Sequence, residues 1–164
     1  MKTEIGEYVV GAYLKVVLGC DFIDYNVRPP GGGLEGLNEL DVVGLDFKNQ
    51  TAYLCEVTTH IRGLLYGSGN QDTVTKIIQK HKRQKAYAEK YLSNFPNRRY
   101  MLWSPVVPVG YITNELAKVE GLELVINKAY TRCVDELQDQ AKQLSNDVGN
   151  PFFRTLQILG ALKR

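Results

Sequence analysis

Two acidic side chains lie inside apolar stretches of this sequence, where a carboxylate is costly to bury. Asp41 stands within residues 38–44, and Glu56 stands within residues 53–59. A charged group is unfavourable in such a place unless it is paired or bound to a metal ion. Neighbouring strands would bring the two carboxylates together. With the backbone carbonyl of Val57 and water, they would offer the hard oxygen ligands that suit Mg²⁺.

Basic residues are concentrated in one segment, although the formal net charge of the whole chain is only +2. Residues 76–99 hold eight lysines and arginines and a single acid. A local field of this kind can hold a polyanion even when the chain is near neutral. We therefore interpret Lys76, Lys80, Lys82 and Arg83 as candidate contacts to a nucleic-acid backbone. A helix face that is simply solvated is the alternative explanation.

The elements that would position these groups follow from periodicity and turn residues. We expect helices at about 4–18, 71–92, 112–119, 131–145 and 151–162, and strands at about 21–27, 38–47, 51–59, 100–107 and 122–126. Antiparallel strands come first and βα units follow, which predicts an α/β fold with a mixed central sheet flanked by helices. The length of 164 residues is typical of a single domain, residues 1–164.

Cysteine usage and hydropathy limit the compartment that we expect. Cys20, Cys55 and Cys133 are odd in number and far apart, so they form neither a zinc motif nor a disulfide framework. Free thiols of this kind are typical of a reducing cytoplasm. No stretch approaches the ~20 apolar residues of a membrane helix, and the N-terminus shows no signal-peptide pattern. We therefore expect a cytoplasmic protein with no membrane partner.

Asp41, fourteen intervening residues and then Glu56-x-Thr58 resemble the signature of the PD-(D/E)xK nucleases. The expected order of helix, three strands, helix and strand resembles the core of that family over roughly residues 1–107. The resemblance implies a restriction-endonuclease-like fold with extra C-terminal helices. It also implies a hydrolase that cleaves phosphodiester bonds with Mg²⁺ or Mn²⁺, in repair, restriction or defence. DNA is a more natural partner than RNA, a homodimer is common in the family, and Glu7 in the first helix would assist the metal.

The sequence departs from the family at Thr58, where the resemblance calls for a lysine. That lysine positions the attacking water and offsets charge in the transition state. Related proteins move it to the next helix. A strand that runs ~13 Å beyond Glu56 and a helix that returns over about nine residues bring Lys80, Gln84 and Lys85 to the level of Glu56. We favour Lys85, which falls near the apolar stripe of the helix, with Gln84 as an orienting neighbour.

Several alternatives remain open at this point. If no lysine reaches the site, the domain would be a degenerate nuclease-like module that binds nucleic acid or protein without cutting. An enzyme that acts on a small metabolite is a more distant choice, because no nucleotide-binding fingerprint occurs. Among single residues, His81 is best explained as a core histidine and His60 as a loop histidine. Glu39 is either a neighbour of the metal ligands or an exposed edge residue.

Overall fold

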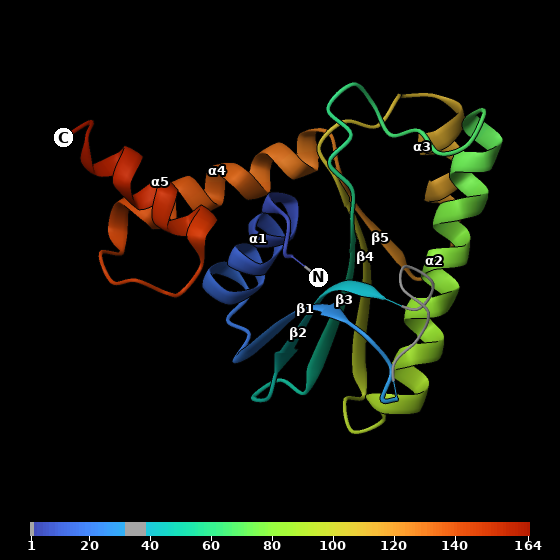
Figure 1. The fold of residues 1–164 in the computed structure, drawn as a ribbon, viewed down its shortest axis with the longest axis horizontal. Helices are drawn as coiled ribbons and strands as arrows, with labels where there is room; N and C mark the ends of the chain where they lie inside the picture. Colours follow the sequence, from blue (N-terminus) through green and yellow to red (C-terminus); the bar gives the residue numbers. More distant parts are fainter. Residues whose placement is uncertain (1, 32–38) are drawn as a thin grey trace.

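The structure, a computed structural model, describes residues 2–31 and 39–164, within which five strands form one mixed sheet between two layers of helices (Figure 1). The strands are β1 (Phe22–Val27), β2 (Leu40–Asp46), β3 (Thr51–Val57), β4 (Asn97–Ser104) and β5 (Leu122–Ile126). The helices are α1 (Ile5–Ala12), α2 (Asn70–Tyr91), α3 (Tyr111–Ala117), α4 (Lys128–Gln143) and α5 (Pro151–Ala161), with a π-helical segment, η1 (Tyr13–Val17), after α1. The predicted α/β fold with a mixed sheet is therefore confirmed. Its elements lie within three residues of the expected bounds when α1 and η1 are taken as the first expected helix.

The strands lie in the order β1-β2-β3-β4-β5. The first two pairs are antiparallel, and β3–β4 and β4–β5 are parallel. A tight turn joins β2 to β3, where the Asp46 carboxylate accepts hydrogen bonds from the backbone N–H of Asn49 at 3.0 Å and from its side-chain amide at 2.7 Å. This hairpin makes β2 and β3 neighbours, which is the arrangement that the two candidate acids require.

The side chains of β3 alternate between the two faces of the sheet, as a strand requires. Leu54 packs in a cluster with Ala88 of α2. Tyr53 and Cys55 belong to the cluster on the opposite face, with Val10 of α1. Helices α2 and α3 thus cover one face, and α1, α4 and α5 cover the other (Figure 1). Because Glu56 follows Leu54 by two residues, its side chain lies on the α2 face.

Helix α1 approaches the sheet closely because two of its residues are glycines. A Cβ on Gly6 would stand 2.3 Å from the Thr59 methyl, and one on Gly11 would stand 2.0 Å from the Tyr25 hydroxyl. Both distances are shorter than atoms tolerate. The glycines therefore allow α1 to lie against the sheet near the end of β3. Within the part of the chain that the structure describes, no helix is both long and apolar enough to cross a bilayer.

Candidate active site

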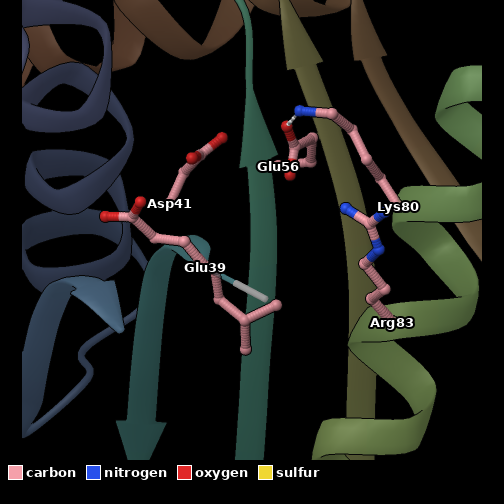
Figure 2. Close-up of a pocket in the computed structure, with 6 residues that line it drawn as sticks. Glu39, Asp41, Glu56, Lys80 and Arg83 are labelled. Carbon is pink, nitrogen blue, oxygen red and sulfur yellow. Dashed lines mark hydrogen bonds and ion pairs between the residues drawn. The ribbon is translucent and has the colours of Figure 1, made fainter. Parts of the chain in front are cut away.

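A pocket of about 170 Å³ opens between β2, β3 and α2, and charged side chains dominate its wall (Figure 2). We call it the carboxylate pocket. Its lining residues are Glu39, Leu40, Asp41, Glu56, Lys80 and Arg83. Figure 2 shows the acids on the two strands and the two cations reaching toward them from α2. Residues from three separate segments thus meet in one place, including the two acids that the sequence singled out.

Asp41 lies where β2 and β3 stop pairing. The last pair of their ladder is Val42 with Cys55. Beyond it, Oδ2 of Asp41 accepts the backbone N–H of Val57 at 2.8 Å. The carboxylate therefore occupies the position that a backbone carbonyl would take in a continuing ladder. Because a strand residue presents its N–H and C=O at the same edge, the Val57 carbonyl also faces the β2 side, as a metal ligand beside Asp41 would.

The carboxyl group of Asp41 is hard to ionise in this position. Burial raises its pKa to about 8, and the nearby charge of Glu56 adds to the rise. The Val57 hydrogen bond and Lys80 lower the pKa, but they do not cancel these effects. Such strongly perturbed groups in a cleft are characteristic of functional sites.

Glu56 and Lys80 form an ion pair across the pocket, and their side chains point toward one another (Figure 2). The Glu56 side chain is 7% exposed and that of Lys80 is 22% exposed. Burial acts to lower the pKa of Lys80, but the charge and hydrogen bond of Glu56 outweigh it, so the net pKa is raised. Lys80 is therefore held in its charged form next to the two carboxylates.

Lys85 and Gln84 do not line the carboxylate pocket, so the expectation that Lys85 faces the sheet at the level of Glu56 was wrong. Lys85 is exposed. Five residues on a helix with 3.6 residues per turn rotate its side chain by about 140° from that of Lys80. Gln84 is fully buried, and its amide donates to the carbonyls of Leu54 at 2.9 Å and Met101 at 3.2 Å. Its hydrogen bonds therefore tie β3 and β4 to α2 rather than orient a group in the pocket.

Glu7 and Thr58 line a separate hollow of about 150 Å³ near the end of β3. Oε2 of Glu7 accepts the backbone N–H of Glu4 at 2.9 Å and the side-chain amide of Asn26 at 3.2 Å. Burial raises the pKa of Glu7, and the charge of Asp41 contributes. Thr58 is buried, and its hydroxyl has no hydrogen-bond partner within residues 2–31 and 39–164. Glu7 is thus close enough to interact with Asp41 electrostatically but lies outside the carboxylate pocket.

The candidate nucleic-acid contacts divide between two sides of α2. Lys80 and Arg83 line the carboxylate pocket. Lys76 is half-buried and lines another hollow beside the same helix. Lys82 is exposed and lines neither. On β4, Arg99 makes a two-bond ion pair with Glu123, at 2.7 and 2.6 Å, so its guanidinium is engaged within the sheet.

The histidines and Glu39 have clear positions. His81 is buried, with ring nitrogens near the Gln84 side-chain oxygen at 3.4 Å and the Glu120 carbonyl at 3.2 Å, which confirms a core histidine. His60 lies in a loop, where its Nδ1 accepts the Leu65 N–H at 3.3 Å. Glu39 lines the pocket with a side chain that is 9% exposed. It is therefore not an exposed edge residue.

Tyr66 is a site residue that the sequence did not reveal. Its ring centroid lies 5.5 Å from Nζ of Lys80 and 5.3 Å from the His60 ring. It stands in the glycine-rich loop between β3 and α2, where neither strand nor helix periodicity applies. A lone aromatic residue in such a loop was the available signal.

The described side chains do not form a complete set of ligands for a metal ion. Across residues 2–31 and 39–164, no three side chains of histidine, cysteine, aspartate or glutamate form a group that could hold a metal ion. Asp41 and Glu56 supply two carboxylates, and further ligands would come from backbone and water. No protein-family model matches the sequence, and no curated protein matches it.

Proposed function

We propose that this protein is a metal-dependent nuclease that hydrolyses phosphodiester bonds, in DNA rather than RNA. The observation that supports this most is the position of Lys80, which reaches Glu56 from α2 beside Asp41. Two carboxylates and one ammonium group thereby converge in one pocket. The resemblance to PD-(D/E)xK nucleases calls for this trio but expects the lysine at position 58. Lys80 supplies the same charge from another element.

The oxygen atoms of the carboxylate pocket fit a hard divalent cation such as Mg²⁺ or Mn²⁺. Asp41, Glu56 and the Val57 carbonyl would hold it. Two features of the pocket favour such an ion: the raised pKa of Asp41 and a buried oxygen of Glu39 without a hydrogen-bond partner among the described residues. A bound cation would favour the ionised form of Asp41, whose pKa is raised mainly by burial and further by the charge of Glu56. It would also face the Glu39 carboxylate, whose other oxygen lies 4.0 Å from Arg28. When bound, the ion would polarise the phosphate and make water more acidic.

The protein's own cations have distinct roles in this proposal. Lys80 is fixed by Glu56, so its ammonium group is already in place to orient the attacking water and to offset charge on the phosphate. Arg83 lies one helical turn further along the pocket wall. Its guanidinium can donate two parallel hydrogen bonds to a phosphate. The Val57 N–H holds Asp41 in one orientation, which keeps the carboxylate ready to bind.

The role of Lys80 can be tested against a matched lysine on the same helix. Single-turnover cleavage of a mixed panel of DNA is measured with Mn²⁺ for the wild type, Lys80→Ala and Lys85→Ala. Removing a preorganised charge typically costs about 100-fold or more in rate, which we expect for Lys80→Ala. Lys85→Ala removes the same charge from an exposed position and should retain the wild-type rate. Equal rates in the two variants would contradict the proposal.

A second variant separates a nuclease from a binding module. Thr58→Lys places an ammonium group at the position that the family resemblance specifies. In the Lys80→Ala background, it should restore part of the lost rate. If the wild type cleaves no substrate while Thr58→Lys alone gains activity, the natural protein binds without cutting, and the nuclease proposal fails.

A further inference from the structure

A second hollow, of about 300 Å³, adjoins the carboxylate pocket along α2. The two share Leu40 and Arg83 in their walls, so they lie side by side with these two residues between them. Tyr87, Lys90 and Tyr91 line its far part. We call this part the tyrosine groove. A chain that enters the carboxylate pocket would therefore continue over Arg83 into the groove.

The groove combines two adjacent, tilted aromatic rings with positive charge. The ring centroids of Tyr87 and Tyr91 are 4.9 Å apart, with their planes at 49°. Nζ of Lys90 lies 5.3 Å from the centre of the Tyr91 ring. Arg83 lies one turn and Lys80 two turns before Tyr87, so the cations and the rings lie along a single side of the helix. This side faces away from the exposed position of Lys85.

Core packing accounts for only one of the two rings. Tyr87 packs against the cluster that contains Leu40 and Ala88. Tyr91 is half-buried but is absent from the core clusters of the described residues. Tyr87 therefore anchors the pair in the core, while Tyr91 packs on Tyr87 and presents ring surface to the groove.

Aromatic rings beside a basic track are the usual means of binding single-stranded nucleic acid. Each ring stacks on a base of any sequence, and the cations follow the phosphates. Inside a duplex the faces of the bases are covered by their neighbours, so a ring on a protein surface can stack on unpaired bases or on the outer face of a terminal pair, but not on interior pairs. The chemistry of the groove therefore favours an unpaired strand over a duplex.

We infer that the tyrosine groove binds unpaired bases of a strand whose phosphate enters the carboxylate pocket. This inference rests on the proposed nuclease function and narrows its substrate to nucleic acid with a single-stranded segment, such as an overhang or a flap. Arg83, which both hollows share, would contact the phosphate between the scissile position and the first stacked base.

Binding of a labelled single strand and of a blunt duplex of the same sequence tests the inference, by fluorescence anisotropy with EDTA present. Wild type should bind the single strand more tightly. Tyr91→Ala should weaken that binding about tenfold and leave duplex binding unchanged, while Tyr91→Phe should behave as wild type. Tyr111→Ala removes an exposed tyrosine, 48% exposed, on α3 and should also behave as wild type. Equal binding by Tyr91→Ala and wild type, or an equal loss for both ligands, would overturn the inference.

Cleavage measured in parallel with Mn²⁺ separates this inference from the proposed function. A protein that cuts nothing but still requires Tyr91 for single-strand binding would contradict the nuclease and leave the groove as a binding site. A protein that cuts blunt duplex through Lys80 at a rate unaffected by Tyr91→Ala would keep the nuclease and remove the groove from its substrate site. Because Tyr91 lies outside the core, thermal unfolding of Tyr91→Ala should match that of wild type.

Discussion

Two groups of buried polar side chains lie between α2 and the sheet, and they differ in how many of their polar atoms have hydrogen-bond partners. In the pair formed by His81 and Gln84, the amide nitrogen donates to two carbonyl oxygens, and each ring nitrogen faces an oxygen atom, to one of which a neutral ring donates its single N–H. The carboxylate pocket lies on the side of α2 that carries Lys80, the residue before His81. It contains Asp41, whose pKa is strongly raised, and Glu39, one of whose buried oxygens lacks a hydrogen-bond partner within the described residues.

The difference indicates separate roles for two sides of one helix. A buried polar group with every hydrogen bond made stabilises the fold, and its loss is costly. A buried carboxylate with a raised pKa lowers stability at neutral pH, and such groups persist where function needs them. We therefore expect substitutions at His81 and Gln84 to change stability, and substitutions in the carboxylate pocket to change activity.

The largest expected effect is on cleavage. Asp41→Asn and Glu56→Gln keep the shape of each side chain but remove the negative charge that would hold a cation. Each should lower the single-turnover rate by about 100- to 1,000-fold. Glu123→Gln, which removes an acid from β5 outside the pocket, is the control and should cut at the wild-type rate. A comparable loss in all three variants would mean that the effect is not local to the pocket.

Gln84→Ala should produce the largest loss of stability. It removes the donor that satisfies the carbonyls of Leu54 and Met101 inside the core and leaves a cavity. We expect the free energy of unfolding, measured by urea denaturation, to fall by about 3 kcal/mol. Gln79→Ala, at an exposed position on the same helix, should change it by less than about 0.5 kcal/mol. Similar losses in both variants would show that the core hydrogen bonds contribute little.

Asp41→Asn should increase stability, with a pH dependence whose sign follows from the raised pKa. The ordinary pKa of 3.8 applies to the unfolded chain, and the folded value is about 8. Between these values the folded state binds the proton more tightly, so the wild type loses stability as pH rises from about 4 to 8. At pH 8 the variant should be more stable by on the order of 2 kcal/mol, the cost of a poorly compensated buried charge. Near pH 4 the two should coincide.

The control for this pH dependence is Asp135→Asn, at an exposed position of α4, which should follow the wild-type profile. Mg²⁺ gives a second check. Because an ion that binds only the folded state stabilises it, Mg²⁺ should raise the melting temperature of the wild type at pH 8 but not that of Asp41→Asn. A wild type that is most stable at pH 8 without metal would contradict the raised pKa.

Thr58→Val should have the smallest effect. The Thr58 hydroxyl is buried and makes no hydrogen bond within the described part of the chain, so a methyl group of similar size removes an unsatisfied donor. We expect the free energy of unfolding to rise by up to about 1 kcal/mol. The cleavage rate should stay near that of wild type, because Lys80 supplies the charge. A fall in rate with unchanged stability would instead indicate that the hydroxyl contacts substrate.

The sequence by itself determined the order of the elements and the location of the two acids. Period-2 alternation placed Glu56 on the same face of its strand as Leu54, and the predicted turn at residues 48–50 made the two acidic strands neighbours. These features are local, because strand pleating and hairpin turns depend on residues that are close in the chain. Asp41 and Glu56 could therefore be predicted to meet before the structure was known.

Only the tertiary structure decided which lysine side chain lies beside Asp41 and Glu56. Twelve residues, 58–69, separate the end of β3 from the start of α2, and their path sets both the level and the rotation of the helix. A rotation error of about 40° exchanges Lys80 for Gln84 and one of about 140° exchanges it for Lys85, because each residue turns the helix by about 100°. Packing of Ile77, His81 and Ala88 against the sheet fixes that rotation. It places Lys80 beside Glu56 and leaves Lys85 exposed.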